Sequence, residues 1–341
     1  MVGSVGRSVG IRNLLTVFFT SIALSAASLG PVTAGNTEVA HAGPSVFVSK
    51  GVFRGGRDWL GRAREGVIEA DLVTKLRRLH EIIGFDLGEV RIYGLVPRLI
   101  LHSLPKDIHQ VSQPNLRKIL FMKTALPLIL DVNEKILADR ARVQRLQKQL
   151  AFGQSLSGTE LSWLKSKSAE YGFGAVNKNL NKLNFKNLLR RLDILPPSLA
   201  LAQAAEESGW GTSRFAREGN ALFGQRTWKG SDGLVPEKRS EGETFRVRAF
   251  KNLLESVWAY AFNLNTHRAY KNFRLVRENL RYSGEALAGS RLIETLTPYS
   301  ERGDEYVQSI KDLIRINSLH QFNSSTLRHL LPSLEGSRSG V

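Results

Sequence analysis

The stretch Leu195–Ser213 reads LPPSLALAQAAEESGWGTS, and it decides how the rest of the chain is interpreted. Two consecutive prolines are tolerated in the first turn of a helix but not later, so they predict a helix start. The residues Leu199–Ser208 are dense in strong helix formers, and Gly209 ends the helix. Because its alanines let other elements approach closely, the end of this helix can be buried.

Two adjacent carboxylates, Glu206 and Glu207, end this helix just before a Gly-Trp-Gly turn around Trp210. A carboxyl buried against Trp210 at a helix C-terminus would have a raised pKa, because burial and the negative end of the dipole disfavour its charge. A general acid that works near neutral pH needs such a pKa. Trp210 would also offer a flat face to a sugar ring. The alternative is a solvated acidic helix end. Adjacent helix residues point about 100° apart, so only one acid can face a cleft.

This stretch, followed by Asn220–Gln225 (NALFGQ), resembles the bacterial glucosaminidase domains of glycoside hydrolase family 73. Three further segments are similar to the bacterial Bax proteins, an exported branch that carries this domain: LPLILDVNEKILADR (126–140), NLNTH (263–267) and YSERG (299–303). The resemblance spans roughly residues 96–317. It implies a peptidoglycan hydrolase that cuts the β-1,4 bond on the reducing side of N-acetylglucosamine, with Glu207 as the catalytic acid. It also implies an N-terminal helical region packed on a lysozyme-like domain.

The family resemblance implies a second acid from the β element and a tyrosine that lines the cleft. Glu237 is our candidate for the second acid, ahead of Glu241 and Glu243, and the alternative is that all three are solvated loop acids. Tyr299 resembles the family tyrosine, and the alternative is a buried core residue. Glu301 is a candidate for an ion pair with a basic neighbour. The expected substrate-binding residues are Trp210, Asn220, Phe223 and Trp228, although Phe223 can equally belong to the core.

Composition excludes several kinds of site. The 341 residues contain no cysteine, which excludes disulfides, thiolate nucleophiles and iron–sulfur clusters. The seven histidines include no pair at i,i+4 on a helix and no HExxH motif, so we expect no metal site. No glycine-rich phosphate loop follows a strand, and we expect no cofactor. The 42% of hydrophobic residues suffice for a globular core.

The N-terminus and the net charge together predict where the protein works. Arg7 and Arg12 precede the short apolar run Leu14–Leu24, which is typical of a secretory signal cut after Ala34 or Ala42. The alternative is an uncleaved membrane anchor. The formal charge of +17 attracts polyanions. An exported protein does not meet the genome, so we expect an anionic cell-wall or membrane surface as the partner rather than nucleic acid. The periplasm or cell envelope is the expected location.

The organisation of the chain follows from composition and periodicity. We expect a signal peptide (1–34), a basic Gly/Arg-rich linker (43–66), a helical region (67–190), the glucosaminidase domain (191–320) and a flexible tail (321–341). Periodicity predicts a long helix over 115–149, kinked or divided at Pro127, and a capped helix from Ser157 to near Gly172. The glucosaminidase domain should contain a strand around 245–249 and helices at 252–266, 284–296 and 304–317. This is an α+β, mostly helical, lysozyme-like organisation, expected to be monomeric.

Two functions are alternatives to a glucosaminidase that acts on peptidoglycan glycan strands: a lytic transglycosylase and a non-catalytic wall-binding protein. Lytic transglycosylases have a similar fold, and their active-site motif begins with the same Glu-Ser pair as the motif of this chain. They typically continue with Gly-Leu-Met-Gln, where this chain has Leu222–Gln225 (LFGQ). A non-catalytic wall-binding protein is the alternative from another class, and the intact motif around Glu207 disfavours it.

Overall fold

The computed structural model describes residues 68–173, 184–227, 233–237 and 244–328. The N-terminal half contains α1 (Val73–Ile82), α2 (Leu87–Tyr93), β1 (Leu95–Pro97), η1 (Ile108–Gln110), α3 (Pro114–Ala151), α4 (Gly158–Glu170) and α5 (Phe185–Arg191). The C-terminal half contains α6 (Pro197–Ser208), α7 (Arg214–Gly219), β2 (Arg226–Thr227), β3 (Gly233–Leu234), β4 (Arg246–Arg248), α8 (Leu253–Thr266), η3 (Arg268–Tyr270), α9 (Lys271–Tyr282), α10 (Gly289–Leu292), η4 (Ile293–Thr295), η5 (Thr297–Tyr299), α11 (Asp304–Ile316), η6 (Leu319–Phe322) and β5 (Thr326–Arg328). The expectation of a mostly helical α+β fold is confirmed. Among the described residues, no helix combines the length and apolar character needed to cross a bilayer.

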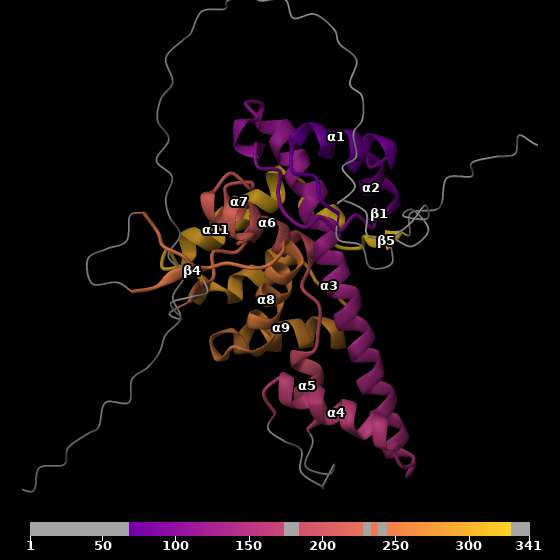
Figure 1. Cartoon of the computed structure of the whole chain (residues 1–341). Coiled ribbons are helices and arrows are strands. Elements are labelled where there is room, and N and C mark those ends of the chain that lie inside the picture. The colour runs from indigo at the N-terminus through magenta and orange to yellow at the C-terminus, as the bar shows by residue number, and fades with distance from the viewer. Residues whose placement is uncertain (1–67, 174–183, 228–232, 238–243, 329–341) are drawn as a thin grey trace, which may run out of the picture.

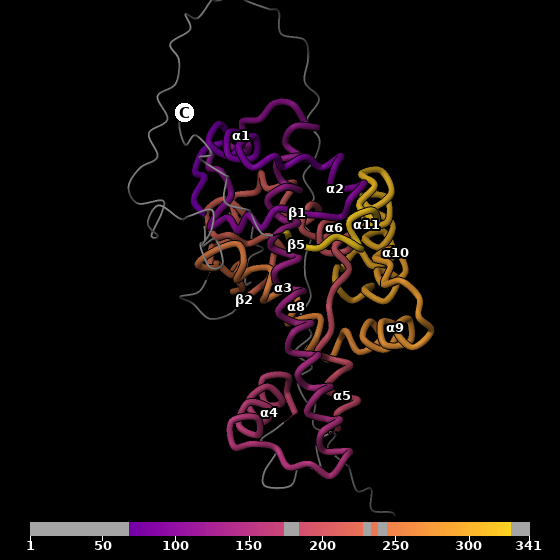
Figure 2. The backbone as a smooth tube through the Cα atoms, turned by 90° about the vertical axis from the view of Figure 1, so that its right-hand side faces the viewer, coloured from indigo at the N-terminus to yellow at the C-terminus, as the bar shows by residue number. Residues whose placement is uncertain are grey.

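Helix α3 joins the two halves of the molecule. It runs from the layer of α1 and α2 to α4 and α5 at the opposite end (Figure 2). Pro127 lies inside α3 and does not divide it, contrary to one of our two expectations. A proline removes one helical hydrogen bond. The loss is tolerated here because the neighbouring turns are packed into the core, where Leu126, Leu128 and Ile129 are buried.

Helix α6, which the deciding stretch forms, lies near the middle of the molecule and packs against α3, α10, α11 and η6 (Figure 1). Every side chain from Pro197 to Ala205 is buried, and most of them are small. The close approach is visible at Gly289, where a Cβ would lie 2.4 Å from the Ser198 Oγ atom. Gly209 ends α6 in the left-handed conformation at φ 58°, as predicted.

The β element is a three-stranded antiparallel sheet with the order β2-β4-β3. Val247 of the central strand pairs with Arg226 on one side and with Leu234 on the other. Val247 is buried and Arg248 is exposed, which confirms the predicted half-buried strand. The Ser157 capping box at the start of α4 is also confirmed.

Our helix predictions were wrong between residues 271 and 296. Helix α9 occupies 271–282, and the predicted helix over 284–296 is reduced to the short α10 and η4. The cause lies in the buried face of α9, which carries Arg274 and Arg277 as well as Phe273 and Leu280. A helical sequence pattern predicts that arginines lie on the surface. In this structure, however, Arg274 and Arg277 donate hydrogen bonds to buried carbonyls.

The predicted flexible tail at 321–341 was also wrong over its first part. Phe322 is fully buried, and β5 pairs with β1 in parallel, Leu327 opposite Val96. These strands lie side by side although more than 200 residues separate them (Figure 2). The pairing supplies β5 with the backbone hydrogen bonds that a free tail would leave to water. Residues 329–341 lie outside the described residues.

Candidate active site

Glu207 occupies the last turn of α6, and its carboxyl group is mostly enclosed. The side chain as a whole is half-buried, while Oε1 is buried and has no hydrogen-bond partner among the described residues. The chain passes close by at Gly224, where a Cβ would lie 3.3 Å from the Glu207 Oε2 atom. Gly224 has a φ of 59°, a conformation that favours glycine. The glycine of the NALFGQ segment therefore lets a loop lie directly against the carboxyl group.

The pKa of Glu207 is raised to about 7. Burial is the main cause, because it penalises the charged form, and the charge of Glu206 raises the pKa further. Hydrogen bonding with Tyr306 and the charge of Arg302 act in the opposite direction. At neutral pH a large fraction of Glu207 is therefore protonated and can donate a proton.

Glu206 has a different environment although it is the adjacent residue. Its Oε1 atom lies 2.5 Å from the Arg302 guanidinium and accepts a hydrogen bond from Ser309 Oγ at 3.2 Å. Both partners flank or belong to α11, so this carboxylate is directed to that helix and neutralised there. The two acids thus have separate surroundings, as the helical geometry requires.

Four buried tyrosines surround the carboxyl group of Glu207: Tyr260, Tyr270, Tyr299 and Tyr306. Gln203, one turn before Glu207 on α6, connects two of them. The Tyr260 hydroxyl donates to Gln203 Oε1 at 2.7 Å, and Gln203 Nε2 donates to the Tyr306 oxygen at 3.0 Å. Because the Tyr306 oxygen accepts this bond, its own proton is available for Glu207. Burial raises the tyrosine pKa values well above their ordinary value at Tyr260, Tyr299 and Tyr306, so the network is neutral.

Gln203 and Tyr306 were missed by the sequence reasoning. The signal for Gln203 was its position four residues before Glu207, which places both on one face of a helix. Tyr306 comes from α11, and no local pattern links it to α6.

Tyr299 and Phe223 are core residues in this structure. Tyr299 is fully buried and stacks on Tyr306 with ring centroids 5.6 Å apart. Phe223 is 1% exposed and stacks on Tyr260 at 3.8 Å with nearly parallel rings. Neither ring forms a surface on which a sugar could lie, which corrects the expectation of cleft-lining side chains. Their packing fixes the tyrosines around Glu207 instead.

Asn220 and Trp210 also have structural contacts. Asn220 adopts the left-handed conformation at the end of α7, and its buried amide donates to the carbonyls of Phe250 and Lys251. Trp210 is half-buried; its ring meets Phe121 of α3 edge-on at 5.8 Å. Asn220 therefore joins the end of α7 to the start of α8. Trp210 packs on α3, and the raised pKa of Glu207 arises from burial and the charge of Glu206.

The described second-acid candidate lies on the surface. Glu237 has an 80% exposed side chain and pairs with Arg214 Nε at 3.2 Å. It is not among the groups that shift the pKa of Glu207. Glu241, Glu243 and Trp228 lie outside the described residues. Glu301 lies 3.8 Å from Arg226 of β2, which confirms the expected ion pair.

Comparisons with known proteins identify the family of this chain. The glucosaminidase family profile, described as mannosyl-glycoprotein endo-beta-N-acetylglucosaminidase, matches residues 182–319. Protein bax of Escherichia coli (strain K12) is 37% identical over 204 residues, which cover 60% of this chain and 70% of that protein. No solved structure gives a significant match. The chain therefore belongs to the family of Bax-type proteins, with a lysozyme-like glucosaminidase domain in its C-terminal half.

Proposed function

We propose that this protein is an exported endo-β-N-acetylglucosaminidase that hydrolyses peptidoglycan, with Glu207 as the general acid. The observation that carries the proposal is the enclosed Glu207 carboxyl group, whose pKa is raised to about 7. A glycosidase acid must hold its proton near neutral pH and release it to the leaving oxygen. The glucosaminidase domain supports the choice of a β-1,4-linked N-acetylglucosamine substrate.

In the proposed mechanism, Glu207 protonates the glycosidic oxygen while the neighbouring sugar develops positive charge. Tyr306 is held by Gln203 and can stabilise the carboxylate that remains. As the glycosidic bond breaks, either the acetamido oxygen of the substrate bonds to the anomeric carbon and water then displaces it, or a second carboxylate assists the attack of water. Glu237, the described candidate for that carboxylate, is exposed and engaged by Arg214, which favours the acetamido oxygen over Glu237.

The products of digestion test the reaction type. We expect purified protein to release fragments that carry N-acetylglucosamine at the new reducing end, detected by mass spectrometry after borohydride reduction. Anhydro-muramic ends would replace this proposal by a lytic transglycosylase. Reducing muramic ends would identify a muramidase, and the absence of any product would favour a wall-binding protein.

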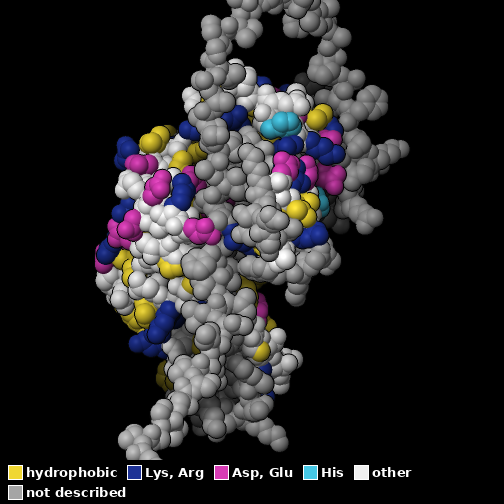
Figure 3. Space-filling model, turned by 90° about the vertical axis from the view of Figure 1, so that its left-hand side faces the viewer, with side chains coloured by type: hydrophobic (Ala, Val, Ile, Leu, Met, Phe, Trp, Pro, Cys, Tyr) yellow, Lys and Arg dark blue, Asp and Glu magenta, His cyan; other side chains and the backbone are white. Residues whose placement is uncertain are grey.

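We further propose that the basic N-terminal segment holds the exported protein on an anionic wall or membrane surface. Removal of residues 1–34 takes away Arg7 and Arg12 and no acid, which leaves a net charge of +15. The face drawn in Figure 3 mixes basic and acidic side chains and shows no large patch of one sign. The segment 43–66, which lies outside the described residues, has four arginines, one lysine and two acids, a net charge of +3. We propose that this short basic segment contributes to the attraction.

Deletion of residues 43–66 should reduce retention on isolated cell walls at low salt. Charge attraction is screened over about 8 Å at physiological ionic strength, so retention of the intact protein should fall as salt rises. Hydrolysis of a small soluble glycan should remain unchanged, because that substrate needs only the surroundings of Glu207. A folded deletion variant that fails on the small glycan would place the segment in the active site instead.

A further inference from the structure

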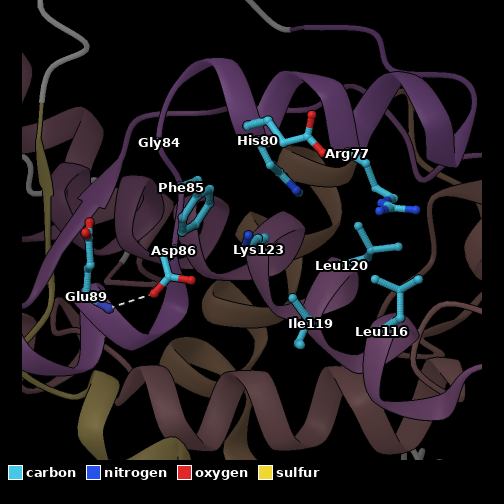
Figure 4. A pocket seen from close by; sticks show the side chains of 11 residues that line it. Arg77, His80, Gly84, Phe85, Asp86, Glu89, Leu116, Ile119, Leu120 and Lys123 are labelled. Atoms are coloured by element: carbon cyan, nitrogen blue, oxygen red, sulfur yellow. Dashed lines mark hydrogen bonds between the residues drawn. The ribbon is translucent and has the colours of Figure 1, made fainter.

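A cavity lies in the N-terminal half, formed by α1, the turn after it, the start of α2 and the first half of α3 (Figure 4). Its volume is about 340 Å³. None of its lining residues belongs to the surroundings of Glu207. The lining contains positive, negative and apolar side chains, and a ligand must be complementary to all three.

Two side chains with nitrogen donors, Lys123 and His80, line one part of the cavity. Lys123 of α3 is half-buried, sits over the Phe85 ring at 5.5 Å, and has no ion pair within 4 Å among the described residues, although the charges of Asp86 and Glu81 act on it. His80 is 4% exposed, and its buried Nε2 atom has no hydrogen-bond partner in the described part of the chain. Its side chain and that of Lys123 both turn toward the cavity in Figure 4. Burial lowers the pKa of His80 to about 3, so the ring is neutral and can offer one N–H group. Arg77 adds an exposed guanidinium to the same wall.

Carboxylates and aliphatic side chains complete the lining. Asp86 accepts the backbone N–H of Glu89 at 3.0 Å, and both side chains are exposed (Figure 4). Glu81 of α1 also lines the cavity and pairs with Arg78 at 3.6 Å. Leu116, Ile119 and Leu120 form one turn of α3 along the cavity. The lining therefore offers donors, carboxylates and an apolar strip within one cavity.

This combination disfavours ligands that carry a single charge. A phosphate or sulfate would meet three carboxylates, and a metal cation would meet Lys123 and Arg77. A ligand with both a carboxylate and an ammonium group satisfies both sets of side chains at once. Its short aliphatic part would lie on the leucines and Ile119, where burial of apolar surface is favourable.

We propose that this cavity binds a short zwitterionic peptide, with its carboxylate at Lys123, Arg77 and His80 and its ammonium group at Asp86 and Glu89. The peptides that substitute peptidoglycan strands carry such groups, so the cavity would recognise the peptide while the site around Glu207 cuts the glycan. Only this choice of peptide source rests on the proposed function.

Calorimetric titration of the full chain with the free dipeptide alanyl-alanine tests the binding. We expect saturable binding, loss of it for the carboxyl-amidated dipeptide, and weaker binding for the N-acetylated one. Lys123→Gln and Arg77→Gln should each weaken binding about tenfold, the effect of losing one charged hydrogen bond. Lys148→Gln, an exposed site on the other half of α3, is the matched control and should bind like the wild type. Arg77 is exposed, so its variant tests the proposal even if Lys123→Gln fails to fold. No saturable binding, or equal binding by all variants, would overturn the proposal.

Hydrolysis assays test the peptide source separately. Lys123→Gln should cut peptide-free glycan at the wild-type rate and peptide-bearing glycan more slowly. Equal rates on both polymers would overturn the wall peptide as the ligand. If the wild type cuts neither polymer, the proposed function fails, while the dipeptide titration still decides whether the cavity binds a zwitterion.

Discussion

Glu207→Gln should fold and lose nearly all hydrolysis of peptidoglycan. The amide keeps the shape of the side chain at the end of α6 but cannot donate a proton to the leaving oxygen. General acid catalysis contributes typically about 10²–10⁴-fold, and we expect a loss in that range for kcat. Because the pKa of Glu207 is about 7, the wild-type rate should fall as the pH rises through neutrality. The variant should lack this dependence in its residual activity.

Glu206→Gln is the matched control, because it makes the same chemical change at the adjacent residue. It should retain most of the activity, since Glu206 pairs with Arg302 rather than facing the enclosed site. The charge of Glu206 raises the pKa of Glu207, so its removal should lower that pKa and move the fall in rate to lower pH. Equal loss of activity in both variants, or an active Glu207→Gln, would contradict the assignment of the acid.

Asp193→Asn should cause a large loss of stability although it lies outside the active site. The Asp193 side chain is 3% exposed and accepts two hydrogen bonds from Arg281, each 2.6 Å long. Arg277, which is fully buried, and Arg140 of α3 lie within 4 Å of the same carboxylate. Removing one member of a buried ion-pair network typically costs about 3–5 kcal/mol, because the remaining charges stay buried without compensation. Urea unfolding should therefore show a decrease of that size.

The pH dependence distinguishes this electrostatic cause from a packing defect. Burial alone would raise the pKa of Asp193, but Arg277 and its neighbours hold it below the ordinary value of 3.8. The contribution of this carboxylate to the free energy of unfolding is therefore fully present above pH 3.8. It is lost as the pH falls through the lower pKa of the folded state. The difference between variant and wild type should shrink over that acidic range. Asp312→Asn removes an exposed pair with Arg315 and should change stability by less than about 1 kcal/mol. A similar effect of both variants would contradict the role of the buried network.

The elements that could be predicted from the sequence are those in which the local signals agree. The prolines, the alanine-rich run and Gly209 specify α6 within one residue of its observed ends. The capping box at Ser157 specifies the start of α4, and the alternation around Val247 specifies β4. In each case the buried face and the residues that start or end the element are encoded by neighbouring positions. These elements can therefore be predicted without knowledge of any distant contact.

By itself, then, the sequence determined the helix that carries the two acids and the family to which the chain belongs. The tertiary structure alone decided which environment each acid has, because Tyr306, Gly224 and Arg302 reach α6 from segments that are distant along the chain. It also decided that α9 forms with Arg277 on its buried face and that β5 pairs with β1. A buried charge is stabilised by partners that lie far away in the sequence, and a strand in a parallel pair bonds to a strand that is equally distant. No local sequence pattern contains those partners.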